Sequence, residues 1–353
     1  GIPSNSSRLT SRPSVVNQGG LSLDSSFTTG TERSTPKNVP TAPMNPKTAP
    51  KICETNDGSP VKRLGSQDGP SARATLADRL AALLRQQTIL QADETPVQQL
   101  DPGAGKTKRA YLWAYRSNDL SGGPPMVVFD YQTSRAGAHA RAFLHGWRGH
   151  LMVDDYAGYK AMFADGPTEL ACLAHIRRKF FDVHAAGGSP VAEQALQRIA
   201  KLYAIEQQGV GLDPPQRMLL REQLALPALA ELHAWLLVNQ RTVAAGSGTA
   251  KAIDHALKRW PALQRYATSG SLPIDNNPVE NVIRPIAIGK KNWLFAGSER
   301  AGRRAAAIQS LFATAKLNGL DPARWLAIVL ERLPTCPNNQ IDSLLPFPNS
   351  TPL

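Results

Sequence analysis

The chain has 353 residues, enough for about two domains, and 42% of them are apolar, which suffices for a buried core. No run of 18 apolar residues and no basic segment leading into an apolar stretch occurs, so we expect no transmembrane helix, no signal peptide and no membrane partner. The formal charge of +12 favours a polyanionic partner such as nucleic acid, although many basic proteins bind none specifically.

The cysteines indicate a reducing compartment. Cys53, Cys172 and Cys336 are widely spaced and odd in number, so they do not form a disulfide framework. We therefore expect a cytoplasmic protein, which the expected nucleic-acid partner would associate with the nucleoid. Because the chain starts with Gly rather than Met, we also expect a fragment or a processed form.

Residues 1–70 are predicted to be disordered or atypical. They contain one aromatic residue against nine prolines and eleven serines, too little apolar surface to offset the entropy of an ordered chain. The composition changes at residue 71, and the leucines that follow recur at helical spacing.

Residues 71–188 alternate strands and helices. The apolar run 88–95 reads as a strand that ends in acids, and two β-branched and aromatic runs follow it. Later strands alternate with helices, so we expect a meander of three strands to which the later strands add in parallel. The fold class is therefore α/β, a mixed sheet flanked by helices.

The rest of the chain is predicted to be helical. Residues 189–270 read as an all-helical insertion, and residues 271–334 return to the first domain with C-terminal helices. Residues 335–353 are rich in Pro and Asn, and we expect a loose tail there.

Three acids in separate places suggest one metal site. Asp93 and Asp154 are predicted to end strands, and Glu280 opens a helix far downstream. Carboxylates at the carboxyl ends of neighbouring strands point into the crevice where α/β proteins bind ligands. Divalent cations relieve the repulsion between such acids, and two Mg²⁺ ions can clamp the attacking and leaving oxygens of a phosphoryl transfer.

Each acid also has a purely structural explanation. Asp93 could cap a turn, and Asp154 or Asp155 could cap the helix that begins at Tyr156. With Asn277 as N-cap, Glu280 takes the third helical position and completes a capping box. Cap and site are compatible, since Asn277, Glu280 and Arg284 share one helix face, where Arg284 is the expected phosphate or carboxylate partner.

Around these acids the sequence resembles transposases of the insertion-sequence 66 family, a group of bacterial DDE transposases. The resemblance covers residues 74–334 and is carried by five ordered blocks. These are "LQADETPV" (90–97), "DDYAGY" (154–159), "CLAHIRRKF" (172–180), "IDNNPVENVIRPIAIGKKNWLFAGS" (274–298) and "SLFATAKLNGLDP" (310–322).

The resemblance implies a ribonuclease H-like catalytic domain with a helical insertion before the last acid. It places the catalytic and metal-binding triad on Asp93, Asp154 and Glu280, with Tyr156 selecting Asp154 over Asp155. It further implies Mg²⁺, with Mn²⁺ able to substitute, and double-stranded DNA, both element ends and target, as substrate. A homo-oligomer on DNA and accessory proteins of the element are the expected partners.

"CLAHIRRKF" resembles an element that several DDE families carry after the second acid. Cys172 and His175 have half of a zinc-site spacing, but no second pair follows, so we favour a structural or positioning role, shared by Asn277. Basic residues here and downstream could be solvated faces, but we expect them to contact DNA phosphates. They are Arg177, Arg178, Lys179, Arg284, Lys290, Lys291, Arg303 and Arg304.

Other interpretations of the sequence stay open. Trp293 and Phe295 lie among the basic residues and could stack on an unpaired base or belong to the core. Residues 1–70 lack the N-terminal helix-turn-helix or coiled-coil part and the cysteine-rich segment of the family, so the chain is expected to be truncated, frameshifted or fused. The leading function is metal-dependent DNA cleavage and strand transfer. The alternatives are a catalytically incompetent DNA-binding remnant and a phosphodiesterase acting on RNA or hybrids.

Overall fold

The computed structural model describes residues 75–348, and the segment 1–70 that the sequence predicts to be disordered lies outside them. The strands are β1 (Ile89–Asp101), β2 (Lys106–Ser117), β3 (Val127–Gln132), β4 (His150–Val153) and β5 (Thr168–Ala171). The helices that flank the sheet are α1 (Leu76–Leu84), α2 (Ala138–Phe143), α3 (Ala157–Lys160), α4 (Leu173–Gly187), α9 (Asn277–Trp293), α10 (Glu299–Leu317) and α11 (Pro322–Arg332).

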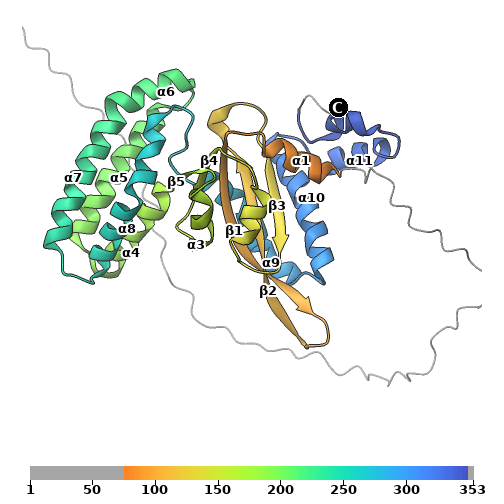
Figure 1. Cartoon of the computed structure of the whole chain (residues 1–353), viewed down its shortest axis with the longest axis horizontal. Helices are drawn as coiled ribbons and strands as arrows, with labels where there is room; N and C mark the ends of the chain where they lie inside the picture. Colours follow the sequence, from red (N-terminus) through yellow and green to blue (C-terminus); the bar gives the residue numbers. More distant parts are fainter. Residues whose placement is uncertain (1–74, 349–353) are drawn as a thin grey trace, which may run out of the picture. The chain divides into compact units, whose positions relative to one another are not determined.

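One mixed sheet has the order β3-β2-β1-β4-β5. The first three strands form an antiparallel meander, whereas β4 pairs in parallel with β1 and β5 in parallel with β4, as predicted (Figure 1). β4 pairs with β1 only over residues 89–91. The edge of β1 beyond Gln91 is therefore open to another part of the chain, and it is there that the candidate site forms.

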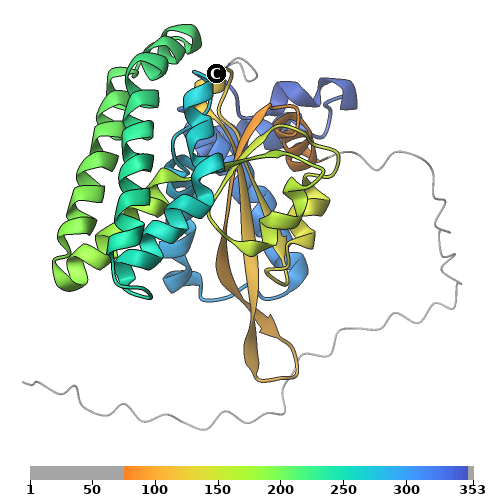
Figure 2. The ribbon, with the colours of Figure 1, turned by 60° about the vertical axis from the view of Figure 1, so that its left-hand side comes forward.

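β1 is longer than the sequence predicts. Asp93 does not end the strand but is the fifth of its 13 residues. The prediction was wrong because β2 pairs with β1 from Leu90 to Asp101, with Asp93 opposite Ala114, and carries the strand past the point where β4 stops. Figure 2 shows the resulting long β1–β2 hairpin. Pro96 is tolerated in this strand, in an exposed position where a missing N–H costs little.

Both faces of the sheet are covered. Trp113 and Tyr115 of β2 pack in one core with α1, α2 and α11, while Leu112 and Ala114 face a second core with α9 and α10. This alternation is the period of two that a strand imposes on its side chains. α10 also covers the edge of β3, because the Ser310 and Thr314 hydroxyls accept from the N–H groups of Phe129 and Val127.

The predicted helical insertion forms a separate layer beside β5 (Figure 1). Its helices pack around buried residues such as Ile199, Leu232 and Ile253, and join α4, β4 and β5 in one core. They are α5 (Pro190–Gln208), α6 (Pro214–Leu220), α7 (Leu226–Thr242) and α8 (Gly248–Leu263). None of the helices in residues 75–348 is long and apolar enough to cross a bilayer.

The sequence predicts a loose tail over residues 335–353, but residues 335–348 pack against the rest of the fold. They contain a short 3-10 helix, η5 (Asn338–Leu344), and Leu344 and Leu345 are completely buried against α1 and α11. Trp325 of α11 donates its indole N–H to the Leu344 carbonyl, and Arg79 of α1 pairs with Asp342. A few apolar side chains hold this segment although its composition is that of a loop.

Candidate active site

The three predicted acids come from three elements that meet at the open edge of β1. The parallel register pairs Gln91 with Met152, and Asp93 and Asp154 each lie two residues beyond that pair. Glu280 lies in the first turn of α9. All three side chains are half-buried. Asp93 therefore lies past the carboxyl end of the parallel β1–β4 pairing, although not at the end of its own strand.

The segment before α9 forms hydrogen bonds with β1 at the point where β4 stops pairing with β1. The Gln91 amide donates to the Asp275 carbonyl (3.0 Å), and the Asn276 side-chain amide donates to the Ala92 carbonyl (2.9 Å). The Asn276 N–H donates to Cys172 Sγ (3.2 Å). Since Asn276 is fully buried, these bonds fix the start of α9, and with it Glu280, beside Asp93.

The pKa of Asp93 agrees with the proximity of the acids. Burial, followed by the charge of Glu94, raises the pKa of Asp93 to about 8, and the charges of Asp154 and Glu280 contribute in the same direction. The Glu94 N–H donates to Asp93 Oδ1 (2.8 Å) and lowers that pKa only in part. Several carboxylates close together in a half-buried place repel one another unless a cation or a proton is present.

The structure separates Asp154 from its neighbour Asp155. Asp155 is held by Arg259 (2.8 Å), Lys160 (2.9 Å) and, at 3.4 Å, His255. Burial alone would raise the pKa of Asp155, but the hydrogen bond from Lys160 and the charge of Arg259 outweigh it and hold the pKa below its usual value. Asp154 accepts only from the Tyr156 N–H (2.9 Å) among the described residues, so it is the acid that is free for a ligand.

The predicted capping box at the start of α9 is wrong. The N-cap is Asn276, one residue earlier than expected, and no side chain caps the helix. Asp275 instead accepts from the Asn277 N–H (3.1 Å), from its side-chain amide (2.8 Å) and from the Tyr203 hydroxyl (3.0 Å). This acceptor closes the turn before the helix, so the Glu280 carboxylate is not needed for capping. Its Oε1 atom is buried without a hydrogen-bond partner in the described part of the chain.

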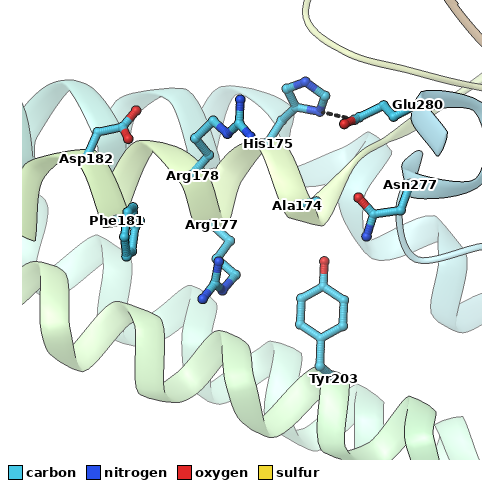
Figure 3. A pocket seen from close by; sticks show the side chains of 9 residues that line it. All are labelled: Ala174, His175, Arg177, Arg178, Phe181, Asp182, Tyr203, Asn277 and Glu280. Carbon is cyan, nitrogen blue, oxygen red and sulfur yellow. Dashed lines mark ion pairs between the residues drawn. The ribbon is translucent and has the colours of Figure 1, made fainter. Parts of the chain in front are cut away.

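Cys172 and His175 lie beside Glu280. Cys172 is the N-cap residue of α4 and His175 lies in its first turn, with His175 Nδ1 3.7 Å from Glu280 Oε1 (Figure 3). The Cys172 thiol, a ring nitrogen of His175 and the Glu280 carboxylate all lie within 4.8 Å of one another. Burial raises the pKa of the Cys172 thiol to about 12, so in the absence of a cation it is a neutral acceptor for the Asn276 N–H.

A cleft of about 570 Å³ opens from this corner. Figure 3 shows His175 and Glu280 meeting at one end, with Arg177 of α4 and Tyr203 of α5 projecting from opposite sides into the space between these helices. Arg178 also lines it, and both arginines are exposed without an ion pair among residues 75–348. Cations are therefore available in the cleft that Glu280 also lines.

The other predicted DNA contacts lie on α4, α9 and α10. Arg303 pairs with Glu299 (2.7 Å) and Lys290 donates to the Pro96 carbonyl (3.2 Å). Arg284 makes no ion pair with Glu280 or any other described residue, so the expected carboxylate partnership is not seen. The remaining cations, Lys179, Lys291 and Arg304, are exposed.

Trp293 and Phe295 are not core residues. The two residues are 44% and 41% exposed, and they line a groove between α9 and α10 that Tyr131 and Ile286 also border. Exposure removes the core alternative that the sequence left open, and it is compatible with contacts to a partner.

Sequence reasoning missed Glu94. Its side chain is 1% exposed, pairs with Arg135 (2.6 Å) and accepts from the Tyr159 hydroxyl (2.9 Å). The Arg135 guanidinium also lies 3.8 Å from the ring centre of Tyr156, whose N–H binds Asp154. Glu94 thus links the strand of Asp93 to the loop of Asp154. Strand alternation could have shown that it points away from Asp93, into the sheet's core, where an acid requires a partner.

Comparison with known proteins identifies the family of the chain. The model of the IS66 transposase family matches residues 71–304, and that of the IS66 C-terminal element matches residues 310–347. The chain therefore belongs to the IS66 family of transposases.

Its relatives include three proteins of Sinorhizobium fredii (strain NBRC 101917 / NGR234). It is 38% identical over 284 residues to "Uncharacterized protein y4qI", a match that covers 77% of this chain and 53% of that protein. It is 37% identical to "Uncharacterized protein y4jD", a match that covers 77% of this chain and 56% of that protein. It is 31% identical to "Uncharacterized protein y4hP", a match that covers 87% of this chain and 59% of that protein. The chain thus spans little more than half the length of these relatives.

Proposed function

We propose that this chain carries the catalytic site of a DDE transposase, which cleaves DNA at the ends of an insertion sequence and joins it to a target. The observation that carries the proposal is that Asp93 in β1, Asp154 after β4 and Glu280 in α9 lie near enough for the charges of the latter two to raise the pKa of Asp93. The sheet order, with a meander followed by two parallel strands, supports a ribonuclease H-like domain, and α5–α8 stand where the insertion is expected.

The three acids suit Mg²⁺, or Mn²⁺ in its place, because carboxylate oxygens are the ligands that these hard cations prefer. The raised pKa of Asp93 supports the fit of these acids to such ions. Burial and three neighbouring carboxylates hold the Asp93 pKa near 8, a state that a divalent cation between the acids would relieve. When bound, two such ions lower the pKa of an attacking water or 3′-hydroxyl and take up charge on the leaving oxygen.

The chain's own groups hold and orient the substrate. Asp93, Asp154 and Glu280 supply the oxygen ligands, and the Glu94 and Tyr156 N–H groups fix the orientation of the two aspartates. Arg177 and Arg178 line the cleft beside Glu280, where they can neutralise DNA phosphates and hold the backbone in place. The exposed cations of α9 and α10 extend this contact along the duplex.

The proposal includes a homo-oligomer on DNA and accessory proteins of the element as partners, since strand transfer brings two element ends and a target together. The alternative, a DNA-binding remnant without catalysis, is favoured by the net charge of +12, which supplies non-specific binding without any need for the acids.

The test is nicking of DNA that carries the element ends, with Mg²⁺ or Mn²⁺. We expect Asp93→Asn, Asp154→Asn and Glu280→Gln each to reduce cleavage by roughly 10³-fold while DNA binding persists. Asp165→Asn, an exposed acid that makes no side-chain bond among the described residues, is the matched control and should cleave normally.

Full activity in any one of the three variants would remove that residue from the site. Salt-dependent binding by the unaltered chain, with no cleavage under any of these conditions, would support the remnant instead. Efficient cleavage of an RNA–DNA hybrid in preference to DNA would overturn the choice of substrate.

A further inference from the structure

The corner formed by α4 and α9 brings together three different metal-binding groups. Cys172 and His175 lie three residues apart at the start of α4, and Glu280 approaches from the first turn of α9. Their donor atoms lie within 4.8 Å of one another, and His175 Nδ1 and Glu280 Oε1 are 3.7 Å apart. Donor atoms around a tetrahedral zinc ion, with bonds of roughly 2.0–2.3 Å, lie about 3.3–3.8 Å apart, so small side-chain shifts would suffice.

Two of these donor atoms have no hydrogen-bond partner among residues 75–348. His175 Nδ1 and Glu280 Oε1 are buried, and neither makes a hydrogen bond in the described part of the chain. Buried polar atoms are nearly always paired, and their separation is too long for a hydrogen bond between them. A cation placed between them would satisfy both atoms at once.

We propose that Cys172, His175 and Glu280 form a site for Zn²⁺ or a cation of similar softness. A thiolate and an imidazole are ligands that Mg²⁺ does not favour, whereas zinc takes both together with a carboxylate. On binding, the thiol proton goes to solvent and the sulfur bonds to the ion. Three protein ligands leave the fourth position open toward the cleft that His175 and Glu280 line.

The site shares Glu280 with the proposed catalytic acids. Zinc bound by Cys172 and His175 would draw the Glu280 carboxylate away from Asp93 and Asp154, and it would therefore inhibit cleavage. This second half of the inference rests on the proposed function, whereas the binding of the ion does not.

Cobalt titration of the full chain tests the binding. Co²⁺ substitutes for Zn²⁺ and gives a thiolate-to-metal charge-transfer band, so we expect one equivalent to produce that band and Zn²⁺ to remove it. Cys172→Ser should abolish the band, and His175→Ala should weaken binding by roughly tenfold or more. Cys53→Ser, Cys336→Ser and Asp93→Asn are controls that should retain it.

The absence of a band in the unaltered chain, or its persistence in Cys172→Ser, would overturn the site. Circular dichroism shows whether the Cys172→Ser chain is folded. If that chain is unfolded, His175→Ala, at a half-exposed position, tests the metal site independently.

Inhibition is tested separately, by adding Zn²⁺ to a cleavage reaction that contains Mg²⁺. We expect low concentrations of Zn²⁺ to inhibit the unaltered chain, and roughly tenfold higher concentrations or more to be needed with Cys172→Ser. Equal inhibition of both would overturn the regulatory role. If the unaltered chain never cleaves DNA, the proposed function fails, while the cobalt spectra still decide whether the ion binds.

Discussion

The edge of the sheet and the corner between α4 and α9 hold their acids in different ways. At the sheet edge, Asp93 and Asp154 each accept a backbone N–H, and ion pairs of Glu94 with Arg135 and of Asp155 with Arg259 lock the surrounding backbone. At the corner, Glu280 Oε1 has no hydrogen-bond partner among residues 75–348. The sheet edge is thus preorganised, whereas the arrangement of the corner depends on what binds there.

Replacing the neighbouring acids Asp154 and Asp155 one at a time should give the largest contrast. We expect Asp154→Asn to reduce cleavage by roughly 10³-fold, because it removes a metal ligand worth several kcal/mol, with little loss of stability. Asp155→Asn should instead lower the free energy of unfolding by about 1–2 kcal/mol, since Arg259 is buried and keeps only Glu169 as an acidic partner in the described part of the chain.

Cleavage rates and denaturant unfolding of both variants measure this difference. A stable, active Asp154→Asn chain together with an inactive Asp155→Asn chain would reverse the assignment of the two acids.

Removing Arg135 tests whether the ion pair behind the sheet edge is needed for stability. Arg135→Met leaves the Glu94 carboxylate, 1% exposed, with the Tyr159 hydroxyl as its side-chain donor, so we expect a loss of about 3 kcal/mol at pH 8. The loss should shrink at pH 5, because burial raises the pKa of Glu94 and lets it take up a proton. Arg141→Met, an exposed arginine of α2, is the control for the loss of a positive charge and should change stability little.

The pH dependence of stability reports on the burial of Asp93 and on its repulsion by the neighbouring acids. The pKa of Asp93 is raised from 3.8 to about 8, so between these values the folded chain binds more protons than the unfolded chain. Its contribution to stability is therefore present below about pH 4 and is lost as the pH rises toward 8.

With a chelator present, Asp93→Asn should raise the melting temperature at about pH 8 but not at about pH 4, and Mg²⁺ should stabilise the unaltered chain at the higher pH. Equal melting temperatures of the two chains at the higher pH would show that neither burial nor the neighbouring acids destabilise the Asp93 carboxylate.

The cleft beside the corner should contribute to DNA binding through charge alone. Replacing Arg177 and Arg178 by Gln should weaken binding to all sequences alike and reduce the slope of log K against log salt by about 0.9 for each phosphate that is no longer neutralised. Arg241→Gln at the end of α7, an exposed arginine away from the cleft, should leave the slope unchanged. Weaker binding to one sequence only would instead indicate base contacts.

Substitutions in the turn before α9 should have the smallest effects on stability. Their relative costs show which residue holds the corner between α4 and α9 in place. Asn277→Ala removes one hydrogen bond at an exposed position and should cost less than about 1 kcal/mol. Asp275→Ala removes the acceptor of the Tyr203 hydroxyl as well and should cost about 2 kcal/mol in urea unfolding. A larger cost for Asn277→Ala than for Asp275→Ala would restore Asn277 as the capping residue.

Local signals in the sequence were enough to predict the order and type of most elements. Short apolar, β-branched and aromatic runs predicted the meander and the later parallel strands, and helical spacing predicted the block between residues 189 and 270. These signals are readable because periodicity and turn chemistry act within a few residues of chain. The sequence blocks also indicated the family.

Tertiary packing, in contrast, set how far β1 runs, which residue starts α9 and which of two adjacent aspartates is free. It also brought Glu280 to Cys172 and His175, from a place that no ligand spacing in the sequence connects to them. Each of these depends on a partner distant in sequence: β2 for the length of β1, Arg259 for Asp155, and β1 for the segment before α9. Such pairings depend on the packed fold rather than on local preference, so the residues themselves did not reveal them.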